Sequence, residues 1–361
     1  MIEADVLVVG AGPAGATAAF NLAPTRKVML VERRPRAAPR IGESLIPAAR
    51  RLLSDMGLLE AFETEGHARC HGNRSVWGTP EPIETDFLRD PDGPGWHLDR
   101  ARFDVWLRAA AVLRGAKLLA PARIAAIKHD GAIWHVTIET GGRPLHAAAR
   151  VVIDAGGRTA RVARQFGAGR RVHDRLVCGW MHGRADPSGP GAGFTFVEAT
   201  EDGWWYSAPL PGSRRVLAFH TDADLPAARI ARDRRALLER TRSTRELSAL
   251  LGACGFAADG ACGFTAAHGA SLEPCAGMAW LAAGDAALAL DPLSARGLFN
   301  ALLTGLAAAE AADRYLSNEA DALAEYDQTI MRMWDGYRRA LATWYRAETR
   351  WRDKAFWVRR Q

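Results

Sequence analysis

Residues 6–15 of the chain read VLVVGAGPAG, an apolar run that leads into three glycines. Such a run predicts a strand buried on both faces, as in a parallel sheet. An alanine-rich helical run follows, and the preset φ of Pro13 suits its first turn. Gly10 allows a tight turn, Gly12 lets a pyrophosphate approach the backbone, and Gly15 lets helix and strand pack closely. The free N–H groups and positive dipole end of the helix would face that phosphate.

A second strand, residues 27–32 (KVMLVE), ends in an acid about 20 positions beyond the glycines, as the dinucleotide-binding pattern requires. The Glu32 carboxylate would accept hydrogen bonds from ribose hydroxyls. The alternative is a glycine turn in another kind of α/β domain, with Glu32 merely solvated. The order of strand, loop, helix, strand and acid favours a dinucleotide without showing which one. The candidate cofactor-binding residues of this region are Gly10, Gly12, Pro13, Ala14, Gly15, Glu32 and Arg33.

The composition limits the fold and the partners. The 361 residues suffice for one large discontinuous unit or for two domains. The formal net charge of +6 comes almost entirely from arginine, yet no basic run is dense enough for a nucleic-acid patch. The five cysteines include no CxxC pair, so we expect no disulfide framework and no metal site, and a reducing, cytoplasmic compartment. The first strand begins at once and no long apolar run appears, so we expect neither a signal peptide nor a membrane span.

The pattern changes in the middle of the chain. Residues 176–218 read as short strands with turns, which predicts an antiparallel sheet on the substrate side. Residues 66–98 are rich in Gly and Pro and are expected to be an irregular excursion over a binding surface. We therefore predict an α/β fold in three parts. The parts are a Rossmann-like dinucleotide-binding domain (1–76, 97–172 and 276–330), an inserted antiparallel-sheet substrate domain (77–96 and 173–275) and a C-terminal helical segment (331–361).

Two stretches beyond residue 280 carry a pattern suited to a polar cofactor. Gly284 and Asp285 end a strand, where carboxylate and backbone together can bond a polyol hydroxyl. Residues 291–300 (DPLSARGLFN) form a turn that opens a long helix. The N–H groups of that turn can face delocalised negative charge, such as the N1–C2=O edge of a reduced flavin. The candidate contacts in the turn are Pro292, Gly297 and Leu298.

Three earlier segments add candidates. Residues 154–161 (DAGGRTAR) place a glycine turn and two arginines at another strand end, with Asp154 and Gly156 as candidates. Arg100 follows Asp99, a plausible N-cap, at the start of a helix, where it can meet a pyrophosphate. Residues 42–44 read Gly-Glu-Ser and add the last two candidates, Glu43 and Ser44.

Taken in order, these motifs resemble the flavoprotein monooxygenase fold of aromatic hydroxylases, tryptophan halogenases and geranylgeranyl reductases. The resemblance covers nearly the whole chain and implies FAD as cofactor in an aromatic-hydroxylase-type domain. It implies that Gly284 and Asp285 contact the ribityl chain and that residues 292–298 lie at the isoalloxazine. The alternative is that these motifs are ordinary turns of an α/β protein.

Three departures separate this sequence from the halogenases that it resembles. Those enzymes carry a Trp-x-Trp-x-Ile-Pro strand, whereas residues 204–209 read WWYSAP. They use a lysine beyond the GES-like segment, whereas no lysine lies between Lys27 and Lys117. They also carry a glutamate after the Asp-Pro-Leu of the flavin loop, where Ser294 stands here. Without that lysine and glutamate, a hypohalite would have neither carrier nor acid, so the resemblance implies a non-halogenating relative.

The sequence also resembles flavoproteins that modify tryptophan in quinone-cofactor amine dehydrogenases and amino-acid oxidases. The similar segments are GNRSVWG (72–78), DGWWYSAPLPG (202–212), residues 221–224 and the terminal tryptophan pattern. This resemblance implies a peptidyl tryptophan as substrate. The substrate-side candidates are Trp204, Tyr206, His71 and Arg296, although the aromatic pair can equally be sheet core. His71 can shuttle a proton or simply be solvated, and Arg296 can orient an anionic group or form an ion pair.

The sequence thus predicts an FAD-dependent monooxygenase that hydroxylates an indole-like ring through a flavin C4a-hydroperoxide during quinone-cofactor biogenesis. The substrate would be a tryptophan of a partner protein. Four alternatives stay open: a small-molecule aromatic hydroxylase, an atypical halogenase of secondary metabolism, an isoprenoid C=C reductase and a non-catalytic flavoprotein. A single dinucleotide pattern leaves the reductant open between NAD(P)H itself and a partner flavin reductase.

Overall fold

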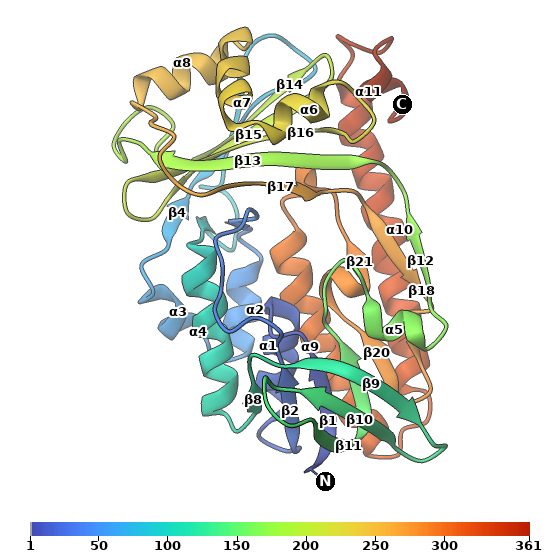
Figure 1. Cartoon of the computed structure of the whole chain (residues 1–361). Coiled ribbons are helices and arrows are strands. Elements are labelled where there is room, and N and C mark those ends of the chain that lie inside the picture. The colour runs from blue at the N-terminus through green and yellow to red at the C-terminus, as the bar shows by residue number, and fades with distance from the viewer. Residues whose placement is uncertain (1) are drawn as a thin grey trace.

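One end of the molecule is built on a sheet whose main strands run parallel (Figure 1). A computed structural model describes residues 2–361. Strand β1 (Ile2–Val9) lies between β2 (Val28–Val31) and β11 (Leu145–Asp154), parallel to both. The sheet continues beyond β2 to β8 (Lys117–Leu119) and beyond β11 to β20 (Trp280–Ala282) and β19 (Ala276–Gly277). Buried apolar residues fill β2 and the second half of β1 (Val6, Leu7 and Val8), as expected for strands covered on both faces.

An antiparallel hairpin extends this sheet. Strands β9 (Arg123–His129) and β10 (Trp134–Glu139) pair with each other, and β10 also pairs with the first half of β11. The Asp130 side chain accepts hydrogen bonds from Ala132 N and Ile133 N and closes the turn. The hairpin expected around Asp130 and Gly131 is therefore confirmed.

Close backbone contacts hold the first helix against the last part of this domain. Helix α1 (Pro13–Leu22) packs on α9 (Gly297–Leu316). A Cβ on Gly305 would lie 2.4 Å from the Ala14 carbonyl oxygen, and one on Gly284 would lie 2.7 Å from the Ala14 Cβ. Because only glycine permits these approaches, the sequence brings the first glycine loop to the Gly284 turn across 270 residues of chain.

A second sheet of seven strands covers the other end of the molecule (Figure 1). Its order is β17 (Cys262–Ala266), β13 (Leu176–Arg184), β16 (Arg214–Asp222), β15 (Gly203–Leu210), β14 (Phe194–Thr200), β5 (Gly72–Val76) and β6 (Ile83–Asp86). All neighbouring pairs are antiparallel except β14 with β5. The expected antiparallel sheet over 176–218 is confirmed, and with it the Rossmann-like α/β fold with an inserted sheet.

The two faces of this sheet pack against different layers. Trp205 packs with Leu217 and Phe219 under helices α6 (Ala227–Arg232), α7 (Arg234–Arg240) and α8 (Glu246–Ala253), which form the outer face. Trp204 packs on the opposite, inner face with Trp180. The alternation of side chains along β15 thus separates the two neighbouring tryptophans.

Residues 66–98 are more regular than expected. They contain β4 (Ala68–Cys70), β5, β6 and β7 (Gly95–His97), and β7 pairs with both β4 and β3 (Ser44–Leu45). The stretch lacks the alternation of apolar and polar residues that marks a strand. Strand β5 also pairs with β14, which lies far along the chain, so no nearby hairpin indicated it. Residues 72–76 pair in the seven-stranded sheet although the predicted boundary of the first domain was residue 76. The division into 1–76, 97–172 and 276–330 against 77–96 and 173–275 stays a proposal.

Further helices and three short strands complete the fold. The remaining elements are α2 (Ala49–Asp55), α3 (Leu59–Glu63), α4 (Arg100–Leu113), α5 (Arg161–Gln165), β12 (Gly169–Val172), β18 (Ala270–Glu273), β21 (Leu288–Ala289), α10 (Ala322–Ala347) and α11 (Ala355–Val358). The Asp99 side chain accepts from Arg102 N and caps α4, as expected. Helix α10 runs along both halves of the molecule, and α11 ends beside the seven-stranded sheet (Figure 1). The helical C-terminus is therefore confirmed.

Candidate active site

The glycine loop after β1 is tied to the acid that ends β2. Ala11 N donates to Glu32 Oε2, and Arg34 N donates to Glu32 Oε1, each at 2.9 Å. Arg108 of α4 donates to the Ala11 carbonyl oxygen through Nε and Nη2. Glu32 therefore fixes the shape of the loop, and its remaining lone pairs are available to ribose hydroxyls.

The space around the loop fits a phosphate group. A Cβ on Gly15 would lie 1.8 Å from the Gly10 carbonyl oxygen, so this side of the loop is filled by protein. A Cβ on Gly12 would meet no atom within 4 Å, and α1 begins at Gly12 without a side-chain cap. The open side thus lies at a helix N-terminus, where backbone N–H groups bind anions.

A hollow of about 580 Å³ lies beyond Glu32. It is lined by Arg33, Thr159, Arg161, Arg164 and Gln165. Arg33, which directly follows the predicted ribose-binding acid, lines this hollow. A role of Arg33 in cofactor binding stays a prediction.

Arg100 lies buried at the start of α4, and one of its N–H donors has no partner among the described residues. Its Nη1 donates to the Gly42 carbonyl oxygen at 2.6 Å, and its Nη2 lies 3.3 Å from Asp104 Oδ1. Its Nε has no hydrogen-bond partner within residues 2–361. Burial, helped by the neighbouring Arg40 cation, lowers the pKa of Arg100 to about 9. An unpartnered buried donor on a cation fits a ligand phosphate, as predicted for this residue.

The Gly284 turn comes to the same region. Gly284 N donates to Thr304 Oγ1, and Arg170 of β12 donates to the Asp285 carbonyl oxygen at 2.8 Å. The Asp285 carboxylate lies 3.4 Å from Arg158 Nε and is about one-third exposed. It also acts on the pKa of Arg100, which shows that the two predicted cofactor residues lie near each other.

The Asp154 side chain orders the turn that follows β11. Its buried carboxylate accepts from Gly156 N at 2.8 Å and from Val162 N and Ala163 N at 2.9 Å. Burial raises its pKa despite these donors. The carboxylate therefore orders the 154–157 turn and the start of α5. A direct cofactor contact of Asp154 or Gly156 stays a prediction.

Two pairs of polar side chains connect the segment around β3 to the inner face of the seven-stranded sheet. Glu43, which is 1% exposed, lies with Oε1 3.0 Å from His182 Nε2 of β13 and accepts from Gly42 N. Ser44 Oγ lies 3.0 Å from the Tyr206 hydroxyl of β15. Both predicted cofactor residues thus contact the substrate-side sheet, and Tyr206 lies where a substrate-side residue was expected.

The turn over residues 291–297 meets the same inner face. It contains a 3-10 helix, η3 (Pro292–Ser294), and leads into α9, which starts at Gly297 without a side-chain cap. Leu293 packs with Trp204 and Tyr206 on the inner face. Leu298 is buried in the main core and holds the helix end in place. The predicted flavin turn, the Glu43 segment and Tyr206 therefore surround one region between the two sheets.

Of the other three substrate-side candidates, Trp204 lies on this inner face and Arg296 lies in the turn, whereas His71 precedes β5. Trp204 is 1% exposed, stacks on His220 with ring centroids 3.7 Å apart, and donates from Nε1 to the Tyr345 hydroxyl. Trp204 is therefore a core residue of the sheet, which was the alternative given for it in the sequence analysis. His71 and Arg296 are exposed, and neither side chain has an ion-pair partner among the described residues. A catalytic role for any of the three stays a prediction.

Sequence reasoning missed His182, Thr304 and Arg170. Each makes its contact across a long stretch of chain, 139 residues in the case of Glu43 and His182. The single available signal was the position of His182 on the same face of its strand as Trp180. Position on a face does not reveal which distant segment packs against it.

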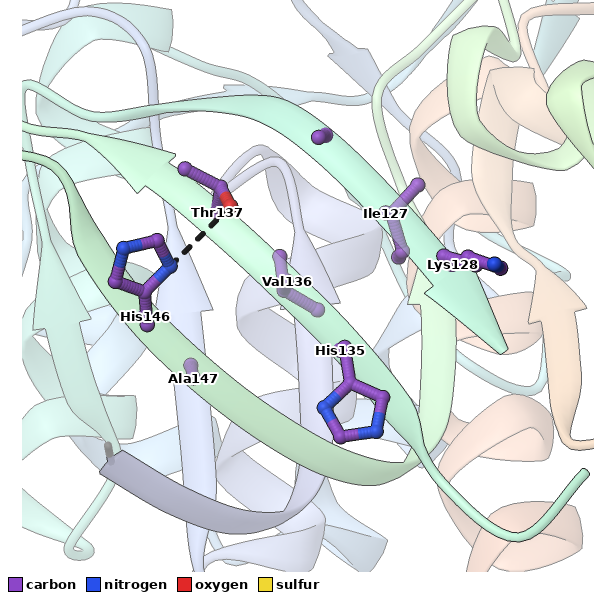
Figure 2. Close-up of a pocket in the computed structure, with 8 residues that line it drawn as sticks. Ile127, Lys128, His135, Val136, Thr137, His146 and Ala147 are labelled. Carbon is purple, nitrogen blue, oxygen red and sulfur yellow. Dashed lines mark hydrogen bonds between the residues drawn. The ribbon is translucent and has the colours of Figure 1, made fainter. Parts of the chain in front are cut away.

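A separate hollow of about 340 Å³ lies on the hairpin formed by β9, β10 and β11 (Figure 2). His146 Nδ1 and Thr137 Oγ1 lie 3.4 Å apart on it, and Lys128 and His135 line its edge. These strands lie at the end of the molecule away from the seven-stranded sheet (Figure 1). The hollow therefore is not part of the candidate active site.

The model of the FAD binding domain family matches residues 3–302. The chain belongs to this family. Over 370 residues it is 28% identical to the putative FAD-dependent oxidoreductase LodB of Marinomonas mediterranea, covering 99% of this chain and 96% of that protein. It is 26% identical to the tryptophan 2-halogenase of Chondromyces crocatus, covering 99% of this chain and 70% of the relative.

Solved structures show the same fold. The myxobacterial chondrochloren halogenase CndH superposes with a TM-score of 0.90 at 25% identity, covering 100% of this chain and 86% of that one. The peptidyl tryptophan dihydroxylase QhpG, essential for tryptophylquinone cofactor biogenesis, gives a TM-score of 0.74 at 24% identity. The match covers 99% of this chain and 79% of that one. Family and relatives together make this chain an FAD-dependent oxidoreductase of the group that contains hydroxylases and halogenases.

The glycine loop alone did not show which dinucleotide binds, and the family identifies it as FAD. The fit is physical as well, since the open side at Gly12 and the spare donor of Arg100 suit its pyrophosphate. None of the helices within residues 2–361 is both long and apolar enough to cross a bilayer.

Proposed function

We propose that this FAD-dependent enzyme hydroxylates an aromatic ring, the indole of a tryptophan in a partner protein. Reduced FAD supplies the electrons that split O₂, so that one oxygen atom replaces a ring hydrogen as hydroxyl and the other leaves as water. The observation that carries the choice of hydroxylation is the distribution of lysine around the candidate active site.

All four lysines of the chain lie away from the segments that surround this region. Lys27 precedes β2, Lys117 starts β8 and Lys128 lies near the end of β9. Lys354 precedes α11 and lies 3.4 Å from Glu201. The sequence resemblance assigns halogenation a lysine and a glutamate, and here the glutamate position is Ser294. These absences favour oxygen transfer over halide transfer.

One solved structure of the same fold supports a protein-bound substrate. The fold is shared with QhpG, which is described as a peptidyl tryptophan dihydroxylase. A small-molecule aromatic ring is the second candidate, because one relative is named a tryptophan 2-halogenase.

Glu43 and His182 supply the proton chemistry in this proposal. Removing the ring hydrogen after oxygen transfer, or an indole N–H proton during it, requires a base within hydrogen-bond reach. The buried Glu43 carboxylate lies 3.0 Å from His182 Nε2 and so orients the ring of His182. Ser44 and Tyr206 form a second pair beside it and can orient a polar substrate group.

The test is a mass measurement on a tryptophan-containing protein or peptide. The purified enzyme with FAD, a reducing system and ¹⁸O₂ is expected to add one or two ¹⁸O atoms to the tryptophan. Bromide-containing product in the presence of bromide would instead establish a halogenase. Turnover without O₂ would establish a C=C reductase. Lack of O₂ consumption beyond free reduced flavin with every aromatic substrate would refute the proposal.

His182→Gln tests the base. We expect kcat to fall about 10²- to 10⁴-fold while FAD stays bound, since a general base contributes on this order. His146→Gln, which changes an exposed histidine on the hairpin, is the matched control and should keep wild-type turnover. Equal turnover in both variants would remove His182 from the mechanism.

A further inference from the structure

The turn that leads into α9 is shaped by the side chain of its first residue. Asp291 Oδ1 accepts from Leu293 N at 2.9 Å. The Asp291 carbonyl oxygen accepts from Ser294 N and from Ser294 Oγ. Ala295 then takes a left-handed conformation with φ of 52°, and α9 begins two residues later. The carboxylate of Asp291 therefore fixes the backbone whose N–H groups are predicted from the sequence to face the flavin.

Helix α10 holds Asp291 through two tyrosines, one at the carboxylate and one at the backbone N–H. The Tyr345 hydroxyl donates to Asp291 Oδ2 at 2.8 Å, and the Tyr337 hydroxyl accepts from Asp291 N at 2.6 Å. Eight residues separate the two tyrosines, so both lie on one stripe of the helix. The Tyr345 hydroxyl also accepts from Trp204 Nε1 of β15. One phenol thus joins the flavin turn, the C-terminal helix and the substrate-side sheet.

This contact is buried, which makes it strong and its loss costly. Asp291 and Tyr345 are each 2% exposed. A hydrogen bond from a neutral donor to a carboxylate removed from water is worth more than an ordinary one. Burial also raises the pKa of Tyr345 well above its usual range, so the phenol stays protonated and able to donate.

We propose that Tyr345 is a positioning residue for the flavin: it holds the Asp291 carboxylate and through it the 291–297 turn in the geometry that receives FAD. This role follows from membership in the FAD family and does not depend on which aromatic substrate the enzyme uses. Residues 322–347 of α10 lie outside the part of the chain that matches the family model. The C-terminal helix is thus a working part of the cofactor site.

The groups around the Asp291 carboxylate set its pKa, so the geometry of the turn should depend on pH. Burial raises the pKa of Asp291 to about 6, and the nearby Asp174 carboxylate adds to the shift. Leu293 N–H, the Arg360 cation and the Tyr345 hydroxyl oppose it. Tyr337, whose pKa is raised by burial, is the remaining titratable neighbour. Below about pH 6 the carboxyl is protonated and the turn loses its best acceptor.

The experiment measures FAD affinity by flavin fluorescence between pH 5 and 8, in wild type and in Tyr345→Phe. Wild type is expected to bind FAD more weakly below about pH 6. Tyr345→Phe should bind FAD about tenfold more weakly at pH 7, the order of one charged hydrogen bond. Its affinity should also fall at a higher pH than in wild type, because the ionised carboxyl has lost a donor. Asp291→Asn should abolish this pH dependence.

Tyr326→Phe is the matched control, because Tyr326 lies on the same helix, is buried, and donates to the Ala282 carbonyl oxygen instead. It should lower thermal stability and leave FAD affinity and its pH dependence as in wild type. If Tyr345→Phe behaves like Tyr326→Phe, the proposal is wrong. If Tyr345→Phe does not fold, Tyr337→Phe tests the same turn through Asp291 N, and unchanged FAD affinity there overturns the proposal. Because FAD binding is measured without substrate, failure here is distinct from failure of the proposed hydroxylation.

Discussion

Gly12 and Gly15 belong to one helix start, yet a methyl group would have opposite consequences at the two positions. At Gly15 it would collide with the Gly10 carbonyl oxygen, which is part of the protein itself. At Gly12 it would project into open space with an ordinary φ of −75°. Gly15 is therefore required by the fold, whereas the need for glycine at position 12 is left to the ligand, as predicted from the sequence; that contact stays a prediction.

Gly12→Ala is therefore expected to fold with wild-type stability and to bind FAD at least tenfold more weakly, because the methyl group occupies the pyrophosphate position. Gly15→Ala is expected to lose about 2 kcal/mol or more of folding free energy through overpacking. Urea unfolding of the apoprotein and flavin fluorescence titration separate the two effects. A destabilised Gly12→Ala, or a stable Gly15→Ala, would contradict this assignment.

Single residues also show where sequence reasoning reaches its limit. Asp99 was predicted as a cap because capping is local, within three residues of chain. Asp154 was expected at the cofactor, and its contacts with Val162 and Ala163 depend on a turn whose backbone no motif specifies. Glu43 was recognised from its motif, whereas its partner His182 follows only from the packing of two sheets.

Among the elements, the seven-stranded sheet shows the same division between local and non-local information. Strands β13 to β16 follow one another closely, so their alternation and turns predicted an antiparallel sheet. Strand β5 joins that sheet through a parallel pairing with β14, about 120 residues further along the chain. Parallel pairs need long crossover connections, which leave no short-range trace in the sequence.

The short helix α11 is held by a buried ion pair. Arg360 donates to both oxygens of Asp222, which is 1% exposed, and its guanidinium lies 3.8 Å from the Phe356 ring centroid. Arg359 contacts the same carboxylate from a more exposed position. Because Asp222 is buried at the end of β16, the loss of Arg360 leaves much of its charge uncompensated.

Arg360→Met is thus expected to lower the folding free energy by about 3 kcal/mol, the order seen when one partner of a buried ion pair is removed. Hydrogen exchange should rise over residues 345–361 before it rises elsewhere. Arg359→Met is the matched control and should have a much smaller effect, since exposed ion pairs contribute little. Equal losses in the two variants would show that burial of the pair is not what anchors α11.

At the scale of the whole molecule, stability should depend on pH through buried histidines. Burial lowers the pKa of His97 and of His220 to about 3 each. Both are neutral in the folded protein and become charged on unfolding below their usual pKa of 6.5. Their contribution to stability is therefore complete above about pH 6.5 and is lost as the pH falls from there towards 3. Asp291 acts in the opposite direction, since its raised pKa favours the folded state below about pH 4 and this gain disappears by about pH 6.

His220→Phe keeps a ring stacked on Trp204 and removes the titrating group. We expect the fall of unfolding free energy between pH 6 and 4 to become shallower by about 1.4 kcal/mol per pH unit, the value for one proton. Urea unfolding at a series of pH values measures this slope. An unchanged slope would mean that the imidazole of His220 accepts a proton in the folded protein.

The contacts of Ala14 have a consequence for the order in which the chain acquires its structure. The glycine loop is among the first parts to be synthesised, yet the residues that press on Ala14 are Gly284 and Gly305. Strand β1 likewise finds its neighbour β11 only after residue 145. A nascent chain that has not yet exposed residue 305 cannot complete the loop's surroundings, so competence to take up FAD arises late in synthesis. Until β11 has emerged, β1 can pair only with β2, so its other edge stays open to aggregation.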